Sequence, residues 1–530
     1  MDLRLAAATA AALLLIVPAT ALAQDGAALA DEPPVSEQRA IRIAERQPDA
    51  VAVKREHPDV FPSADRADGD RDWEVGFFAD DEQLVQVVVD DQSGVVEESW
   101  TGYQVAWRMA RGYDGAFGRK LNAPWVWLPL CAIFVLGLFD WRRPLRLAHL
   151  DLLVLVAGFG VSHFFFNRGE IGLSVPLAYP ALLYLLARTL WLAFRGGEGL
   201  RPSLPVKWLA ILTVALIGFR VGLNVADSNV IDVGYSGVVG ADLISDRETL
   251  YGNFPEDNGH GDTYGPLAYY AYVPFEQILP WGGDWDELPA AHAAAIFFDL
   301  GTIAALFLLG RRLRPGDSGA LGILLAFAWA ACPCTAFALE SNTNDSLVSL
   351  LLVCALLFLS SPPARGALLA AASLTKFAPL VLVPLFATYR DPPGARLGRT
   401  LLGFASAFVV VTLAVMAETL LDPGLSKFWE RTLGNQAGRE SPFSVWGQAS
   451  LEWLHTLLKL GVAALAVAVA LFPRRRGPVT IAALGAAVLI AVQLTVEHWF
   501  YLYIPWFAAF LFVALLAREA PDIDREPAAG

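Results

Sequence analysis

Apolar runs of about twenty residues follow one another through most of the chain, and they limit its fold more than any other feature. A helix of that length crosses the apolar layer of a membrane, because each residue adds about 1.5 Å along the axis. The expected spans are 124–140, 147–167, 171–194, 206–225, 288–310, 319–339, 345–360, 397–421, 450–472, 478–496 and 499–517. The sequence therefore predicts an all-α polytopic membrane protein with about eleven spans.

Composition indicates that a water-exposed part is present as well. Hydrophobic residues make up 55% of the chain and charged residues 17%, too many charges for a protein that lies wholly in the membrane. Near the start, Arg4 precedes the apolar run "LAAATAAALLLIVPAT" and then "ALA" at 21–23, a pattern typical of a signal peptide. We predict a signal peptide over 1–23, with an uncleaved anchor helix as the alternative. Either way, the residues that follow are exported.

Residues 24–122 form the predicted extracytoplasmic domain. They include 21 acidic and 11 basic residues, which gives −10 of the chain's net charge of −14. Such a charge repels nucleic acid and anionic lipid, so nucleic acid is not an expected partner. The segment 34–48 reads as a short amphipathic helix that ends at Pro48, and 72–102 reads as a small meander. Its expected turns are Asp80-Asp81 and Ser93-Gly94.

The strands of this domain carry a resemblance of their own. The run "WEVGFF…LVQVVVDDQSGVVEESWTG" resembles a PepSY-like domain, in which a VD-x-x-x-G-x-V turn is common. The resemblance implies a small α+β module that senses a signal or contacts a protein partner. The alternative is a domain that only covers the membrane domain and has no specific function.

The cysteines do not indicate redox or metal chemistry. All four lie in apolar runs, so the exported domain has no disulfide although its compartment would permit one. We interpret them as small buried apolar residues, and no spacing of His, Asp and Glu indicates a metal site or a cofactor. The four are Cys131, Cys332, Cys334 and Cys354.

Basic residues in short loops set the expected orientation. With the exported domain outside, the net positive loops that begin at 140, 195, 311 and 361 lie inside. A single crossing by 366–388 would put the Arg-rich stretch 390–399 outside. We therefore predict a re-entrant hairpin that breaks near Lys376 and Pro379, since proline interrupts a helix. The alternative is thirteen spans.

This predicted membrane topology divides the chain into domains and places many polar residues at the outer face. The parts are three additional spans over 123–204, a membrane domain over 205–517 and a cytoplasmic tail over 518–530. A polar loop, 226–287, begins where a span ends, which holds Asp232 near the outer surface, where it could act as a base on a lipid-borne substrate. Asp227 and Asp242 are alternative bases, and a structural carboxylate is a further alternative. Nearby glycines and tyrosines, Tyr235 among them, suit a tight loop with aromatic platforms for sugar rings.

Five motifs in order carry a second resemblance. They are the exposed Asp after a helix, "SDRETLYGNFP", "TYGPLAYYAYVPFE", "LTKFAPLVLVPL" and "SPFSVWG". Over roughly 205–517 the chain resembles the GT-C integral-membrane glycosyltransferases, most closely glycosyltransferase family 87. The resemblance implies an inverting transfer from a polyprenyl-phosphate sugar, with mannose favoured, to the hydroxyl of a lipid or glycan acceptor at the outer face of the plasma membrane. The three spans and the exported domain that precede this core are a departure from the family.

Residue roles follow from the same resemblance. It implies that Asp232 is the general base, that Lys376 and Arg439 contact the phosphate, and that His498 is a second donor. Cations at the departing phosphate would stabilise its charge. Further substrate contacts are expected at Asp262, Tyr264, Tyr235, Asn344 and Trp446.

Several of these residues have structural alternatives. Asp262 could cap a helix, as could Asp345 next to Asn344. Arg439 could pair with Glu440 or Glu418, and His498 could anchor a helix end. Separately, Arg220 and Asp299 lie at similar depths in their spans, and we predict that they form a buried structural pair.

Two other functional classes remain open at this point. A lipid or solute transporter would show paired repeats and ionisable groups near the middle of the membrane. A non-catalytic sensor would work through the PepSY-like domain, and changes at Asp232 or Lys376 would then have no effect. The concentration of polar groups at one face favours glycosyl transfer.

Overall fold

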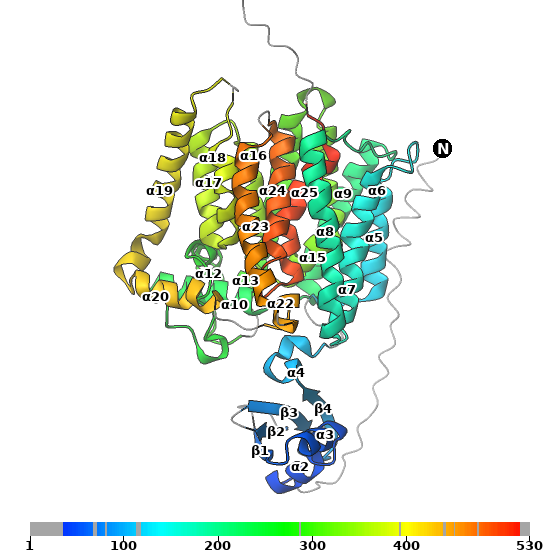
Figure 1. The fold of residues 1–530 in the computed structure, drawn as a ribbon, viewed down its shortest axis with the longest axis vertical. Coiled ribbons are helices and arrows are strands. Elements are labelled where there is room, and N and C mark those ends of the chain that lie inside the picture. Colours follow the sequence, from blue (N-terminus) through cyan, green and yellow to red (C-terminus); the bar gives the residue numbers. More distant parts are fainter. Residues whose placement is uncertain are drawn as a thin grey trace, which may run out of the picture. The chain divides into compact units, whose positions relative to one another are not determined.

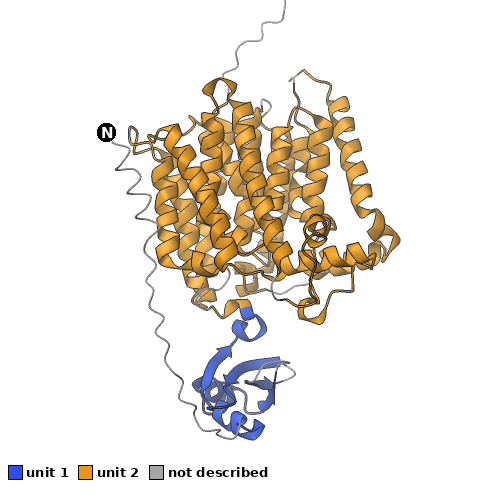
Figure 2. Ribbon diagram, turned by 180° about the vertical axis from the view of Figure 1, so that it is seen from behind, with its two compact units in different colours: residues 1–108 blue, residues 109–530 orange. Residues whose placement is uncertain are grey.

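The computed structural model describes residues 35–66, 72–79, 82–112, 118–285, 288–391, 394–437, 441–449, 451–473 and 476–519. The predicted signal peptide, the Asp80-Asp81 turn, Arg439 and nearly all of the predicted tail lie outside the described residues. The chain forms two compact units, residues 1–108 and 109–530 (Figure 2). Each unit is described by itself.

The first unit is a small α+β domain. Its elements are α2 (Glu37–Ala44), α3 (Pro48–Glu56), β1 (Phe61–Asp65), β2 (Trp73–Ala79), β3 (Glu82–Val89) and β4 (Val96–Thr101). The strands form one antiparallel sheet in the order β1-β2-β3-β4, with Val75 opposite Val87 and Val87 opposite Ser99. Alternate valines of β3 and the small residues Ala40 and Ala44 of α2 share one core. The predicted α+β meander is therefore present.

Two local details differ from the sequence prediction. The helix expected over 34–48 ends at Ala44, and Pro48 begins α3 instead of ending its predecessor. Proline suits the first turn of a helix, where its missing N–H has no partner to lose. Strand β1 was also not predicted. The turn at Ser93-Gly94 is confirmed, since the N–H of Gly94 donates to the carbonyl of Asp90 at 2.9 Å.

The second unit is helical, and its long helices run side by side (Figure 1). The longer helices are α5 (Pro124–Leu138), α6 (Leu147–Leu153) continuing through the π-turn η3 (Val154–Gly158) into α7 (Phe159–Phe166), α8 (Ile171–Arg195), α9 (Val206–Asp227), α10 (Asp232–Asp246), α13 (Pro289–Leu313), α14 (Ala320–Ala331), α15 (Pro333–Glu340), α16 (Asp345–Leu357), α17 (Pro362–Thr375), α19 (Leu397–Leu421), α23 (Glu452–Leu471), α24 (Pro478–Gln493) and α25 (Ile504–Leu516).

One further short helix, α4 (Tyr103–Ala106), ends the first unit, and η1 (Arg108–Ala110) spans the boundary in the sequence. The short helices of the second unit are η2 (Arg119–Asn122), η4 (Glu256–Asn258), α11 (Leu267–Tyr270), α12 (Val273–Glu276), η5 (Pro315–Asp317), η6 (Ala378–Leu382), α18 (Val383–Ala387), α20 (Leu425–Trp429), η7 (Glu430–Gly434), α21 (Asn435–Ala437), α22 (Val445–Gln448) and η8 (Tyr501–Tyr503). Helices α10, α12, α20 and α22 gather at one end of the bundle (Figure 1).

The bundle has the composition of a polytopic membrane protein. Within the described ranges, six helices are long and apolar enough to cross a membrane, or seven if α14 and α15, bent by 60° at Cys332, form one span. Four more of the expected spans correspond to shorter apolar helices, α5, α16, α24 and α25. Only 17% of the most apolar stretch of α19 is buried within the protein, which leaves an apolar surface for lipid.

The predicted break in the 366–388 segment is present. Helix α17 ends at Thr375, Lys376 is extended, and the chain continues as η6 and α18. At the start of α17 the buried guanidinium of Arg365 donates to the carbonyls of Leu359, Phe386 and Tyr389, at 2.5, 2.9 and 2.6 Å. Both ends of the segment therefore lie together, and the segment turns back at Lys376.

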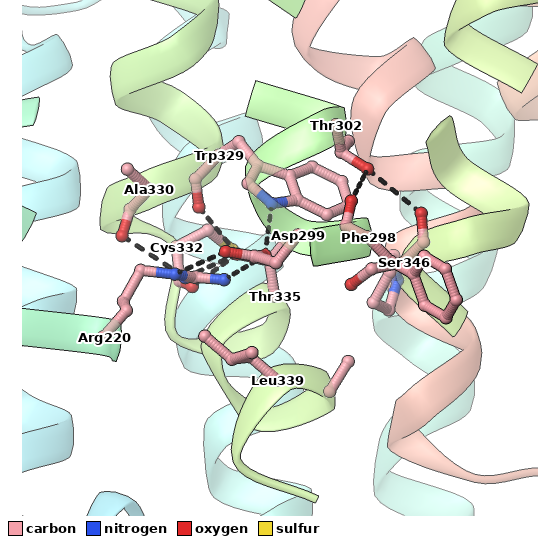
Figure 3. A network of polar contacts seen from close by, with 12 residues as sticks. Arg220, Phe298, Asp299, Thr302, Trp329, Ala330, Cys332, Thr335, Leu339 and Ser346 are labelled. Carbon is pink, nitrogen blue, oxygen red and sulfur yellow. Dashed lines mark hydrogen bonds and ion pairs between the residues drawn. The ribbon is translucent and has the colours of Figure 1, made fainter. Parts of the chain in front are cut away.

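A polar network ties the middle of the bundle together (Figure 3). Arg220 of α9 and Asp299 of α13 form the predicted buried pair, each with 1% of its side chain exposed and with Nη2 and Oδ1 2.5 Å apart. Arg220 also donates to the carbonyl of Ala330 and to Thr335, while the indole of Trp329 donates to Asp299 at 2.8 Å. The cysteines are free, with Cys332 and Cys334 buried and the other two half-buried.

Candidate active site

Lys376 occupies the centre of the candidate site. It stands at the break after α17, with 6% of its side chain exposed, and its Nζ lies 2.7 Å from Oδ1 of Asp345 at the start of α16. The indole N–H of Trp506 in α25 donates to the same oxygen at 2.8 Å. A lysine buried to this degree requires a counter-charge, and the broken helix brings it to one.

Aromatic rings surround the ammonium group of Lys376. Its Nζ lies 5.1 Å from the ring centroid of Tyr264, 5.5 Å from that of Trp506 and 5.7 Å from that of Tyr503. These distances suit cation–π attraction between the ammonium group and the rings. The three rings come from a loop, from η8 and from α25, so the site joins parts of the chain that are far apart in sequence.

A close backbone approach fixes the loop that carries Tyr264. A Cβ on the next residue, Gly265, would lie 2.1 Å from the carbonyl oxygen of Leu374, so only glycine lets the loop lie directly on α17. The hydroxyl of Tyr251 donates to the carbonyl of Tyr264 at 2.9 Å, and the N–H of Tyr264 donates to the hydroxyl of Tyr269 at 3.1 Å. The loop therefore places Tyr264 next to Lys376.

Asp232 is the first residue of α10, and its side chain is exposed. Its carboxylate accepts from the N–H of Val233 at 2.9 Å, and its carbonyl accepts from the hydroxyl of Ser236 at 2.6 Å. A Cβ on Gly234 would lie 2.3 Å from the carbonyl oxygen of Asn342, so the first turn of α10 packs directly on the segment before α16. The prediction of a tight loop here was wrong, because the glycines instead let a helix approach its neighbours closely.

Electrostatics join Asp232 to the residues around Lys376. Burial raises the pKa of Tyr264 well above its usual range, and the negative charges of Asp232 and Asp345 raise that pKa further. The structure brings Tyr264, Asp345 and Lys376 together, and the charge of Asp232 acts on the same tyrosine.

Several buried polar atoms beside this group have no hydrogen-bond partner in the described parts of the chain. They belong to Asn344 (both amide atoms), Asp345 (Oδ2), Ser346 (Oγ) and Tyr272 (hydroxyl). Buried polar atoms in proteins are nearly always paired, and leaving one unpaired costs about 1–3 kcal/mol. A concentration of unpaired groups next to a buried ion pair is the arrangement expected of a binding site for a polar ligand.

Two further predicted substrate contacts, Asp262 and Tyr235, bind to other residues of the protein. Asp262 is buried, and its Oδ2 accepts from Nε of Arg431 at 2.6 Å and from the N–H of Gly252 at 2.8 Å. Tyr235 stacks on Trp285, with centroids 4.6 Å apart, and its hydroxyl donates to Asp257 at 3.2 Å. Both residues hold together the loop that follows α10.

Trp446 and His498 lie elsewhere in the same unit. The ring of Trp446 stacks on His455 with centroids 4.6 Å apart, and its indole donates to the carbonyl of Leu494. His498 lies beside Ser441, with Nδ1 and Oγ 3.0 Å apart, and beside Phe443. Neither belongs to the rings that the structure shows around Lys376.

The alternative bases occupy different surroundings from Asp232. Asp227, at the end of α9, lies 3.2 Å from Nζ of Lys120. Asp242 lies ten residues beyond Asp232 on the same helix, which is about 15 Å along its axis. Burial and the nearby carboxylate of Glu276 raise the pKa of Asp242.

One group of carboxylates in the described ranges has a spacing that could hold a metal ion. Asp72, Asp90 and Asp91 offer oxygens within 4.8 Å of one another, in the first unit. Arg66 lies 3.5 Å from Asp91, and the hydroxyl of Ser93 donates to Asp90. Protein groups therefore already occupy two of the three carboxylates.

Fold and site together define a polytopic integral-membrane protein with a polar, charged site at one end of its helix bundle. Residues 263–517 match the model of glycosyltransferase family 87, so this part of the chain belongs to that family of GT-C membrane glycosyltransferases. The match begins at 263, later than the 205 expected from the sequence, and it includes Tyr264, Asp345 and Lys376 but not Asp232. No curated protein matches the chain.

Sequence reasoning missed part of the site. Asp345 was considered only as a cap or a neighbour of Asn344, and Tyr503 and Trp506 were not considered. The sequence indicated Asp345 only indirectly, because Lys376 needs an acidic partner when it is buried. Tyr503 and Trp506 lie more than 120 residues after Lys376, and no local pattern in the sequence indicates that contact.

Proposed function

We propose that this membrane glycosyltransferase moves a hexose or pentose from a polyprenyl-phosphate donor to a hydroxyl of a lipid or glycan acceptor. The reaction would invert the anomeric centre and take place at the outer face of the plasma membrane. A mannose-type donor is favoured by the family resemblance. The observation that carries the proposal is the buried Lys376–Asp345 pair, with unpaired polar atoms beside it and an exposed carboxylate nearby.

Asp232 is proposed as the general base. It would take the proton of the acceptor hydroxyl while that oxygen attacks the sugar carbon from the face opposite the phosphate. Its exposed carboxylate supports this role, and its place at the start of α10 puts that carboxylate at the positive end of the helix dipole. Because Asp232 lies outside the family match, the support for it is geometric.

Lys376 is proposed to hold the departing phosphate. An ammonium group has three N–H donors, and the contact with Asp345 uses one of them. The remaining donors can reach a phosphate oxygen at the point where negative charge develops, in surroundings that exclude water. Asp345 and Trp506 would keep Nζ in position for this.

The other predicted contacts keep proposed roles of smaller weight. Arg439 is proposed as a second phosphate contact, and His498 as a second donor. Asn344 and Tyr264 are proposed to contact the sugar, supported by the unpaired amide of Asn344 and by the high pKa of Tyr264, which keeps its hydroxyl protonated. Trp446, Tyr235 and Asp262 stay proposed substrate contacts, and each also bonds to or stacks on another residue of the protein.

The first unit is proposed to be an extracytoplasmic PepSY-like module that contacts a protein partner. Its support is the antiparallel meander beside two short helices and its acidic character.

The proposal is tested with purified full-length protein and a panel of polyprenyl-phosphate sugars, by following release of polyprenyl phosphate in the presence of a membrane lipid extract as acceptor. One donor is expected to turn over. Asp232→Asn and Lys376→Ala should each abolish turnover while the thermal unfolding transition remains. Matched controls are Asp242→Asn on the same helix and Lys427→Ala, an exposed lysine paired with Glu430.

Each contrary result points to a specific error. If Asp242→Asn abolishes turnover and Asp232→Asn does not, the base is Asp242. If Lys376→Ala turns over at the rate of the Lys427 control, the phosphate lies elsewhere. Failure of every donor in the panel contradicts the polyprenyl-phosphate donor itself.

A further inference from the structure

Two adjoining cavities lie outside the candidate active site. On α13 the first is bordered by residues from Leu300 to Phe307 and the second by residues from Phe307 to Arg312. None of the residues that line them is among those around Lys376, so the cavities are separate from the candidate active site.

The first cavity is an apolar groove between α9, α13 and α14, with a volume of about 340 Å³. Its walls include Val214, Ile217, Ile303, Ala304, Ile323 and Phe307. Val214 is 70% exposed, so the groove opens onto the lipid-facing surface of the bundle. An acyl chain of the surrounding lipid would gain van der Waals contacts with these side chains there.

The second cavity is basic and has a volume of about 500 Å³. Arg311, Arg312, Ser318 and Gly319 line it, together with Phe307, which also borders the groove. A shared wall residue means that the two cavities adjoin. They form one site with an apolar part and a basic part.

The charge of the basic cavity is not neutralised by the residues that the structure describes there. Arg312 donates to the hydroxyl of Ser360, and the guanidinium of Arg311 lies over the ring of Phe307 at 5.9 Å. The nearest loop carboxylate, Asp317, is used by Arg314 and by the N–H groups at the start of α14. The two guanidinium groups that line the cavity thus have no carboxylate partner among the described residues, an arrangement that favours an anion.

The dimensions of the groove point to a lipid of one leaflet. On α9 it extends from Ala210 to Ile217, about 10 Å along the axis. Half of the apolar layer of a membrane is about 15 Å thick. The groove therefore suits one acyl chain whose headgroup stays at the surface, rather than a long polyprenyl chain.

We infer that these cavities bind an anionic phospholipid, with its phosphate on Arg311 and Arg312 and an acyl chain in the groove between α9, α13 and α14. The inference does not depend on the proposed sugar transfer, because it uses none of the residues around Lys376. The bound lipid would fill the space between three helices that meet at the Arg220–Asp299 pair.

The test uses the purified full-length protein, freed of lipid, and native mass spectrometry with phosphatidylglycerol or phosphatidylcholine. The wild type should retain phosphatidylglycerol in preference to phosphatidylcholine. Arg311→Gln should weaken that binding about tenfold, since it removes a charge-assisted contact. The matched control Arg314→Gln removes the same charge one turn away, at a residue that pairs with Asp317 and does not line the cavity.

A second variant, Ala304→Phe, fills the groove and should also weaken binding of phosphatidylglycerol. The inference is overturned if the two lipids bind equally, or if Arg311→Gln binds as the wild type does. It is also overturned if inorganic phosphate displaces phosphatidylglycerol at equal concentration, since the groove would then contribute nothing. If polyprenyl phosphate displaces it at lower concentration, the assignment to a phospholipid is wrong.

Discussion

Two buried ion pairs in the same bundle differ in how completely they are satisfied. In the pair Arg220–Asp299, both partners make further hydrogen bonds, to Ala330, Thr335 and Trp329 (Figure 3). In the pair Lys376–Asp345, one carboxylate oxygen has no partner in the described chain, and neither does the amide of the adjacent Asn344. Their charged atoms lie at similar distances, 2.5 and 2.7 Å.

Under the proposed function, the difference separates a structural pair from one that binds the substrate. A saturated pair holds helices together and has no capacity for a ligand, whereas an unsaturated pair remains unfavourable until something completes it. Burial and distance alone would not have distinguished them. The carboxylates of the pairs do, because both oxygens of Asp299 accept hydrogen bonds, whereas Oδ2 of Asp345 accepts none from the described chain.

The largest expected effect comes from breaking the saturated pair. Arg220→Ala leaves Asp299 as an uncompensated buried charge, which should lower the free energy of unfolding by about 3–5 kcal/mol. Thermal unfolding in detergent measures this. The double variant Arg220→Met with Asp299→Asn should lose much less, and equal losses for both variants would show that the pair is not what holds these helices.

The same double replacement at the other pair should separate activity from stability. Lys376→Met with Asp345→Asn removes both charges, so the midpoint of thermal unfolding should change little. Sugar transfer should fall about 10²–10³-fold, the usual loss when a stabilising donor is removed from a reaction centre. If transfer survives in this variant, the pair is structural and the comparison fails.

A smaller effect is expected at the unpaired amide beside the second pair. Asn344→Ala should lower kcat/KM about tenfold by removing contacts to the sugar, which corresponds to about 1.4 kcal/mol. The free energy of unfolding should stay the same or rise, because the change deletes buried groups that have no partner. A variant that unfolds more easily and transfers sugar normally would contradict this.

The smallest effect is expected where the saturated network meets the site. The hydroxyl of Thr302 donates to the carbonyl of Ser346, which links α13 to the first turn of α16. Thr302→Val should cost about 1 kcal/mol of stability in thermal unfolding. Thr189→Val is the matched control, since the hydroxyl of Thr189 bonds only to carbonyls of its own helix, and it should cost less.

Features that depend on local sequence or on the depth of a residue in the membrane were predictable. The break at Lys376 followed from the positions of basic residues and a proline, and the pair Arg220–Asp299 followed from helix rise. The glycines of α10 were misread as loop residues, because a glycine that permits close packing looks the same in sequence as one that permits a turn. The rings around Lys376 depend on tertiary contacts that no local pattern reports.

Arg365 also has a consequence for how the chain enters the membrane. Its guanidinium is satisfied by carbonyls of Phe386 and Tyr389, which the ribosome adds more than twenty residues later. Until then the guanidinium can stay at the inner surface, where the loop that begins at 361 is expected to lie. The burial of Arg365 should therefore be completed only after the segment from Pro362 to Tyr389 has been made and has folded back on itself.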